Sequence, residues 1–262
     1  MFLRSIAPLT LGCLVALGVS WPRDARAQAD DHHAAMHAAV GDVDFPVSCK
    51  PEAQEKFDVL AAMLYSFYWE KIDAAAADVL AADPDCAMAY WALAVASLAN
   101  PLGSPPSAKQ EAHGWEMVQK AKQLGAKTER ERDWIDAIAV VFEDYDTVPF
   151  KQRAQAYTDA LARLHARWPD VREAALQYAF WVQVTADRND QTHARQLESA
   201  KLLEPLFATH PNHPGIAHFL IHAYDFPSIA DRGLDAARRY ASIAPDSPHA
   251  LHMPSHIFSR VG

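Results

Sequence analysis

Apolar residues recur at helical spacing from Pro51 almost to the end of the chain. The first such segment places on one helical face Phe57, Leu60, Ala61, Leu64 and Phe67. Proline-containing stretches, such as residues 83–84 and 100–106, interrupt the period and indicate turns or loops. Glycine is scarce, with nine residues in the chain, and alanine is frequent, which favours helices over strands. The pattern therefore predicts an all-α fold built from antiparallel helix pairs.

Two helical segments near the C-terminus repeat each other. Residues 214–225 and 248–260 align at an offset of 34 positions, and each opens with a proline and carries two histidines four residues apart. Pro211 and Pro245, which precede these segments, keep the same spacing. This is the length of a tetratricopeptide repeat (TPR). We therefore predict a right-handed solenoid of TPR-like helix pairs, in which the first helices line a concave groove.

The N-terminus has the features of a secretory signal. Arg4 precedes an apolar run over residues 6–19, and Ala25-Arg26-Ala27 forms a small-x-small cleavage site. The apolar run is too short for a comfortable membrane span. We predict that residues 1–27 are a signal peptide, that the protein is periplasmic or secreted, and that it has no stable membrane insertion.

Residues 28–48 show no clear period and are predicted to be a mobile arm. The arm contains His32, His33 and His37, which are possible additional metal ligands or simply solvated side chains. Residues 49–262 form the predicted TPR-like repeat domain. Gly262 falls where such repeats place the glycine between their two helices, so the domain is predicted to be truncated in the middle of a repeat.

The charge and the cysteine content limit the classes of partner that this protein is expected to bind and the compartment in which it is expected to fold. The formal net charge is −9, and residues 1–27 hold three arginines and one aspartate, so their removal makes the chain more acidic. An acidic protein is a poor partner for nucleic acid and a better one for cations. Cys49 and Cys86 stand before two successive repeat units. In an oxidising compartment we expect them to form a disulfide, and two free thiols are the alternative.

The repeat register places six polar side chains on the groove wall of two neighbouring helices. They are His218, His222, Asp225, His249, His252 and His256. Residues four apart on a helix lie about 6 Å apart at Cβ, so four imidazoles are able to converge on one or two metal ions. Imidazole and carboxylate together suit Zn, Cu or Fe. The alternative is that the histidines are packing residues. Pro254 lies inside the second segment and bends it, which either misaligns His252 and His256 or aims them.

Several motifs resemble a family of exported bacterial TPR proteins of poorly defined function. They are FPVSC (45–49), AMAYWALA (87–94), GAKTERER (125–132), HPGIAHFLIHAYD (213–225) and APDSPHALHMPSHIFSRVG (244–262). The resemblance implies a TPR fold and a longer C-terminus, and it implies hardly anything about function.

Three functions are compatible with this sequence. The first is an exported TPR scaffold that binds a transition metal in a histidine-lined groove. The second is an interaction module that holds a protein or peptide partner in the groove without metal. The third is a metal-dependent enzyme, which we disfavour because no glutamate accompanies the histidine pairs in the HExxH manner.

Overall fold

The computed structural model describes residues 39–262. The predicted signal peptide and the candidate ligands His32, His33 and His37 lie outside the described residues. The helices, in chain order, are α2 (Pro51–Tyr65), α3 (Trp69–Ala82), α4 (Ala87–Ser97), α5 (Ala108–Leu124), α6 (Glu129–Phe142), α7 (Phe150–Arg167), α8 (Arg172–Val184), α9 (Ala194–Thr209), α10 (Pro214–Tyr224), η1 (Ala230–Gly233), α11 (Leu234–Ile243), α12 (Pro248–His252) and α13 (Pro254–Val261).

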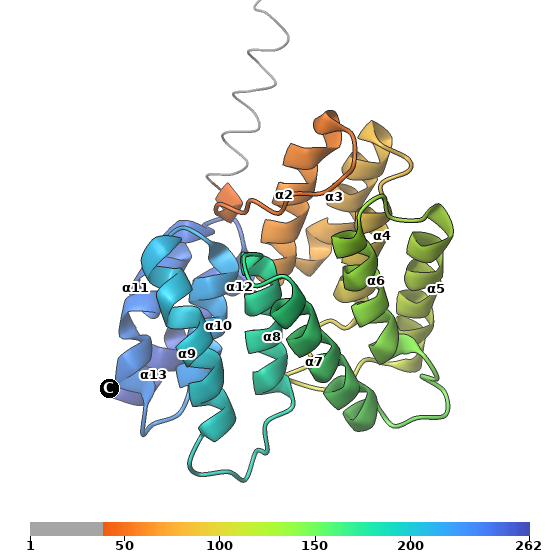
Figure 1. The fold of residues 1–262 in the computed structure, drawn as a ribbon. Helices are drawn as coiled ribbons and strands as arrows, with labels where there is room; N and C mark the ends of the chain where they lie inside the picture. Colours follow the sequence, from red (N-terminus) through yellow and green to blue (C-terminus); the bar gives the residue numbers. More distant parts are fainter. Residues whose placement is uncertain (1–38) are drawn as a thin grey trace, which may run out of the picture.

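Helices that follow one another in the chain pack as antiparallel pairs. The pairs α2–α3, α4–α5, α6–α7, α8–α9 and α10–α11 are each in contact and stack side by side along the array (Figure 1). No strand occurs between residues 39 and 262. The predicted all-α, TPR-like array of helix pairs is therefore confirmed. In the same part of the chain, no helix is both long and apolar enough to cross a membrane.

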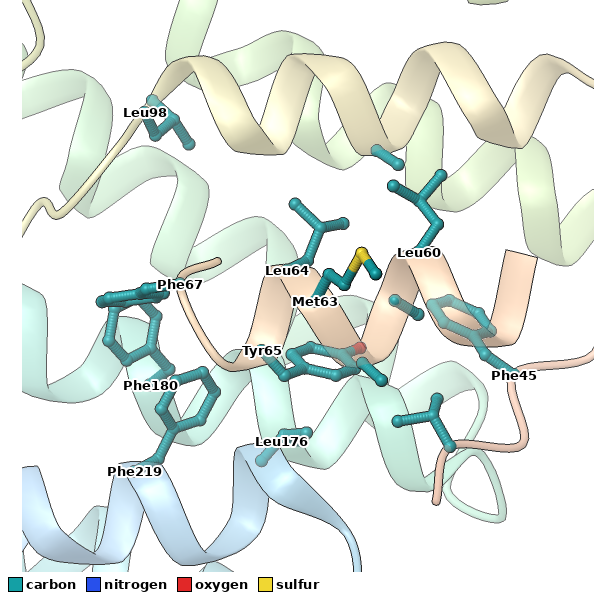
Figure 2. Close-up of a cluster of buried hydrophobic side chains, with 14 of the residues drawn as sticks. Phe45, Leu60, Met63, Leu64, Tyr65, Phe67, Leu98, Leu176, Phe180 and Phe219 are labelled. Atoms are coloured by element: carbon teal, nitrogen blue, oxygen red, sulfur yellow. The ribbon is translucent and has the colours of Figure 1, made fainter. Parts of the chain in front are cut away.

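The first helix of the array lies in its centre. Helix α2 contacts not only α4 of the next pair but also α10 of the fifth pair. Every residue of α2 from Phe57 to Tyr65 is buried, as expected of a helix that other helices surround. In Figure 2, Leu176 of α8 and Phe219 of α10 lie beside Tyr65 at the end of α2. The concave groove that the first helices were expected to line is therefore closed at this point, because α10 packs on α2.

A close approach between α10 and α2 depends on Gly215. A Cβ atom on this residue would lie 2.8 Å from Tyr65 Cβ and 3.1 Å from Leu176 Cδ2. The first distance is shorter than real Cβ contacts and the second is tight, so glycine lets the first turn of α10 lie directly on the last turn of α2. This contact brings the C-terminal end of α2 to the histidines of α10.

Residues 39–48 are not a mobile arm. Val40, Val43 and Phe45 are buried. The Phe45 ring lies 5.5 Å from that of Trp91 and 5.3 Å from that of Trp134, between centroids. Burying a large aromatic side chain contributes about 1.5–3 kcal/mol. It adds to the hydrogen bonds from Phe45 N to Asp58 Oδ1 and from Val47 N to Gln54 Oε1, which tie this segment to α2. The prediction of a mobile arm is wrong for this part of residues 28–48.

A disulfide joins Cys49 and Cys86, as the first of the two sequence interpretations predicted. Their Cα atoms lie 5.1 Å apart. Cys49 stands just before α2, and Cys86 is the N-terminal cap residue of α4. The bridge therefore joins the N-terminal end of α2 to the N-terminal end of α4, the first helix of the next pair.

Candidate metal centre

His218 is the buried centre of a histidine cluster. It lies on α10, and its side chain has no exposed surface. Its Nδ1 atom is 2.6 Å from the carbonyl oxygen of Tyr65. A carbonyl only accepts hydrogen bonds, so Nδ1 carries the hydrogen and donates it. In the neutral ring Nε2 then has a free lone pair, which is the form that binds metals.

The Nε2 atoms of two further histidines converge on this lone pair. His222 Nε2 lies 3.0 Å from His218 Nε2, and His249 Nε2 lies 2.9 Å from it. Either is in position to donate an N–H to this single lone pair. The ligand nitrogens of the three residues all lie within 4.8 Å of one another, close enough to hold a metal ion. We call His218, His222 and His249 the inner triad.

The C-terminal end of α2 holds both neighbouring helices in this arrangement. Helices leave their last carbonyl groups without partners inside the helix. Here the Tyr65 carbonyl accepts the hydrogen bond from His218, and the Ser66 carbonyl accepts one of 3.0 Å from Ser247 Oγ. Ser247 is the N-terminal cap residue of α12, which carries His249. The partial negative charge at this helix end also favours a cation bound nearby.

Burial keeps the inner triad neutral. It lowers the pKa of His218 well below its usual range, and the repulsion that protonated His222 and His249 would exert lowers it further. Burial, followed by repulsion from neighbouring histidines, lowers the pKa of His222 to about 3 and that of His249 to about 4. At neutral pH the three residues are thus uncharged imidazoles, the protonation state in which histidine binds metals.

Two aromatic rings enclose the triad. The Phe67 ring lies 4.6 Å from that of His218, 5.1 Å from His249 and 6.4 Å from His222, between centroids. The Tyr240 ring stacks on His218 at 5.4 Å. Phe67 has φ of 51°, in the left-handed region that bulky residues rarely adopt. This conformation turns its ring from the end of α2 towards the histidines.

Sequence reasoning did not identify the roles of Phe67, Tyr65 and Tyr240. Phe67 was expected to continue the apolar face of the first helix, but that helix ends at Tyr65. The contribution of Tyr65 to the site is a backbone carbonyl, which any residue type supplies. No sequence pattern indicates such a contact, because it depends on two segments that are far apart in the chain.

The three remaining predicted ligands form a separate group beside the triad. His252 Nε2 lies 3.0 Å from His256 Nε2, and His256 Nδ1 lies 2.8 Å from Asp225 Oδ2. Arg260 Nε donates to the other carboxylate oxygen of Asp225 at 3.0 Å. The six residues predicted to face one side of two neighbouring helices thus fall into two groups of three. The carboxylate of Asp225 holds a histidine and an arginine, and it is not part of the inner triad.

Pro254 does not misalign the histidines of the last helix. It ends α12 at His252 and opens α13, because proline has no N–H to donate. Met253 between the two helices keeps helical angles, with φ of −56° and ψ of −36°. The direction of the chain thus continues across the break, and His252 and His256 still meet through their Nε2 atoms.

The pKa of His222 predicts a loss of stability in acid. Its folded pKa of about 3 lies below the value of about 6.5 for an exposed imidazole. The unfolded chain therefore binds the proton more readily, and the contribution of neutral His222 is complete above pH 6.5 and declines as the pH falls towards 3. At pH 5 this residue should cost the folded state about 2 kcal/mol. Urea unfolding with a metal chelator at pH 7.5 and pH 5 measures the loss.

The variant His222→Gln provides the comparison. It should lose about 2 kcal/mol less than the parent between the two pH values, because glutamine does not titrate. Asp58 has a pKa raised to about 6 by burial and acts in the opposite direction, but it is present in both proteins and cancels. Equal losses in parent and variant would contradict the prediction.

Comparisons with known proteins add little to this description. No model of a known protein family matches the chain, and no curated protein is significantly similar to it in sequence. Among solved structures, the chain is similar to YrrB, described as a TPR protein with an unusual peptide-binding site. The identity is 14%, the match covers 76% of this chain and 90% of that chain, and the TM-score is 0.37. The helix pairs described above, and not this likeness, establish the architecture.

Proposed function

We propose that this protein is an exported helical-repeat scaffold that binds a transition metal ion, Zn, Cu or Fe, through Nε2 of His218, His222 and His249. The observation that carries the proposal is the convergence of three neutral imidazoles on one point, with Nε2–Nε2 distances of 2.9 and 3.0 Å from His218. The disulfide between Cys49 and Cys86 supports a location outside the reducing cytosol.

The spacing of the nitrogens is close to what a metal requires. Zinc binds imidazole nitrogen at about 2.0–2.1 Å, so two nitrogens in a tetrahedral site lie about 3.3 Å apart. The Nε2 atoms of His222 and His249 need to move away from that of His218 by only a few tenths of an ångström to reach this spacing, and they lie within 4.8 Å of each other. A bound ion would replace the N–H···N contacts of the triad, and His222 and His249 would hold it in the tautomer that carries the hydrogen on Nδ1.

The surroundings of the triad favour the bound state further. The hydrogen bond to Tyr65 fixes the ring and tautomer of His218, which is the usual role of a partner behind a metal-binding histidine. His222 and His249 are partly exposed, so solvent is able to supply a fourth ligand. Three histidines and one water form a common zinc environment.

The other two functions have less support. Peptide binding was predicted for the concave groove, and the first helices α2 and α10, which were expected to line it, are largely buried against their neighbours. A protein or peptide partner therefore stays a prediction. For an enzyme, Asp225 was the acid nearest to the histidine pairs, and its carboxylate is held by His256 and Arg260. It is not free to act as a general base.

Titration with zinc tests the proposal. Protein freed of metal by a chelator is titrated with Zn(II) at pH 7 in a calorimeter, and we expect a tight binding step of one equivalent. The variant His249→Ala should weaken this step by at least about 100-fold, because it removes a ligand. His113→Ala, which changes an exposed histidine on α5, is the matched control and should bind like the parent. Absence of a tight step in the parent, or an unchanged one in His249→Ala, would overturn the proposal.

A further inference from the structure

The pair His252 and His256 has the arrangement of a second metal position. Their Nε2 atoms lie 3.0 Å apart, the same spacing as in the inner triad. His256 Nδ1 donates to the carboxylate of Asp225, so its Nε2 has the free lone pair that accepts the N–H of His252. A carboxylate behind a histidine is a frequent support of a metal ligand, because it fixes the tautomer and makes the free nitrogen more basic.

Asp225 is itself held in place. Arg260 Nε donates to Asp225 Oδ1 at 3.0 Å while His256 occupies Oδ2. The carboxylate is thus engaged on both oxygens and has little freedom to rotate away. Because Asp225 ends α10 and His256 and Arg260 lie on α13, these contacts also fix α13 against the helix that carries two residues of the inner triad.

The pair lies directly beside the inner triad. The ring of His222 is 6.3 Å from that of His256, and the ring of His249 is 6.2 Å from that of His252, between centroids. The two groups differ in access to solvent. His218 is fully buried, whereas His252 is exposed and the side chain of His256 is 32% exposed.

We propose that His252 and His256 form a second, solvent-open position for a divalent transition metal next to the inner triad. Only two protein nitrogens hold this ion, and water completes its coordination. The outer ion therefore binds more weakly than the inner one and exchanges more readily. Together the two positions make a pair of unequal metal sites, a closed one and an open one. The pairing rests on the proposed function of the triad, but the outer position is testable by itself.

The number of Zn(II) equivalents that each single variant binds distinguishes the two metal positions. The parent protein, titrated with Zn(II) after chelator treatment, should bind a tight and a weak equivalent. His256→Ala should lose the weak step and keep the tight one, whereas His249→Ala should keep the weak step and lose the tight one. Asp225→Asn should lower the affinity of the weak step about 10–100-fold and leave the tight step unchanged, because the hydrogen bonds of the Asp225 carboxylate go to His256 and Arg260 and not to the inner triad. Thermal unfolding without metal verifies that each variant is folded.

The outcomes distinguish this inference from the proposed function. A parent that binds a single equivalent, or His256→Ala that keeps both steps, would overturn the outer position and leave the inner triad intact. A weak step that persists in a parent without a tight one would support the outer position and refute the inner one. If Asp225 has only a structural role, Asp225→Asn should have a lower thermal stability and an unchanged weak step. This result also counts against the inference.

Discussion

Replacement of His218 by alanine is expected to lower the affinity for Zn(II) by about 1,000-fold, or about 4 kcal/mol. His218 is the one residue of the triad whose Nε2 lies near 3 Å from both other ligand nitrogens. Its loss removes a ligand together with the hydrogen bond to Tyr65 that orients it. Loss of a hydrogen-bond partner behind a metal ligand by itself lowers metal affinity about 10–100-fold, so the loss of ligand and hydrogen bond together should be larger.

The same substitution should also destabilise the protein without metal. It leaves the buried Tyr65 carbonyl without its donor, which costs about 1–3 kcal/mol, and it opens a cavity next to Tyr240 and Phe67. A loss of zinc binding by alanine alone would therefore have two explanations, the missing ligand and the altered fold.

The variant His218→Gln separates these explanations. Its amide N–H is able to donate to the Tyr65 carbonyl, and its amide oxygen is able to accept from His222 and His249. We expect stability close to that of the parent and zinc affinity as low as in His218→Ala. Calorimetric titration gives the affinity, and urea unfolding with a chelator gives the stability. If either variant binds zinc within threefold of the parent, the triad is not the metal site.

Removal of the disulfide, by Cys49→Ser together with Cys86→Ser, is expected to lower the free energy of unfolding by about 4 kcal/mol. The bridge closes a loop between cysteines 37 residues apart, and the open chain gains this conformational freedom when it unfolds. The bridge also fixes the start of α2, the helix that packs against both α4 and α10. Urea unfolding of the oxidised parent and the double variant measures the difference.

The reduced parent is the matched control for the serine variant. Cys86 is buried, so a serine hydroxyl at this position carries a cost of its own. The reduced parent keeps both thiols and lacks only the bond. We expect it to unfold about as easily as the double variant, and equal stability of the reduced and oxidised parent would refute the prediction. Zinc affinity, measured where all forms are folded, should change little, because the triad lies at the other end of α2.

Several errors of the sequence interpretation have one origin. The segment around Phe45 has no period and was expected to be mobile, yet the ring packs between Trp91 and Trp134 of other helix pairs. Asp225 falls in the same register as the histidines and was expected to bind metal, yet Arg260 and His256 engage its carboxylate. In each case the position of the side chain depends on a contact with another helix, and the local pattern does not specify that contact.

The helices, their pairing and the histidine pairs are predictable without a structure, because each of these follows from spacing within one repeat. An apolar period of 3.6 residues specifies a helix, and histidines four apart share one of its faces wherever that helix lies. Which of those histidines meet depends on contacts between segments that are far apart in the chain. His218 and His249 are joined at 2.9 Å because the array curves until α10 lies on α2, and the carbonyls of Tyr65 and Ser66 then hold α10 and α12 together. That curvature is a sum of contacts along the whole array, so no single segment of the sequence encodes it.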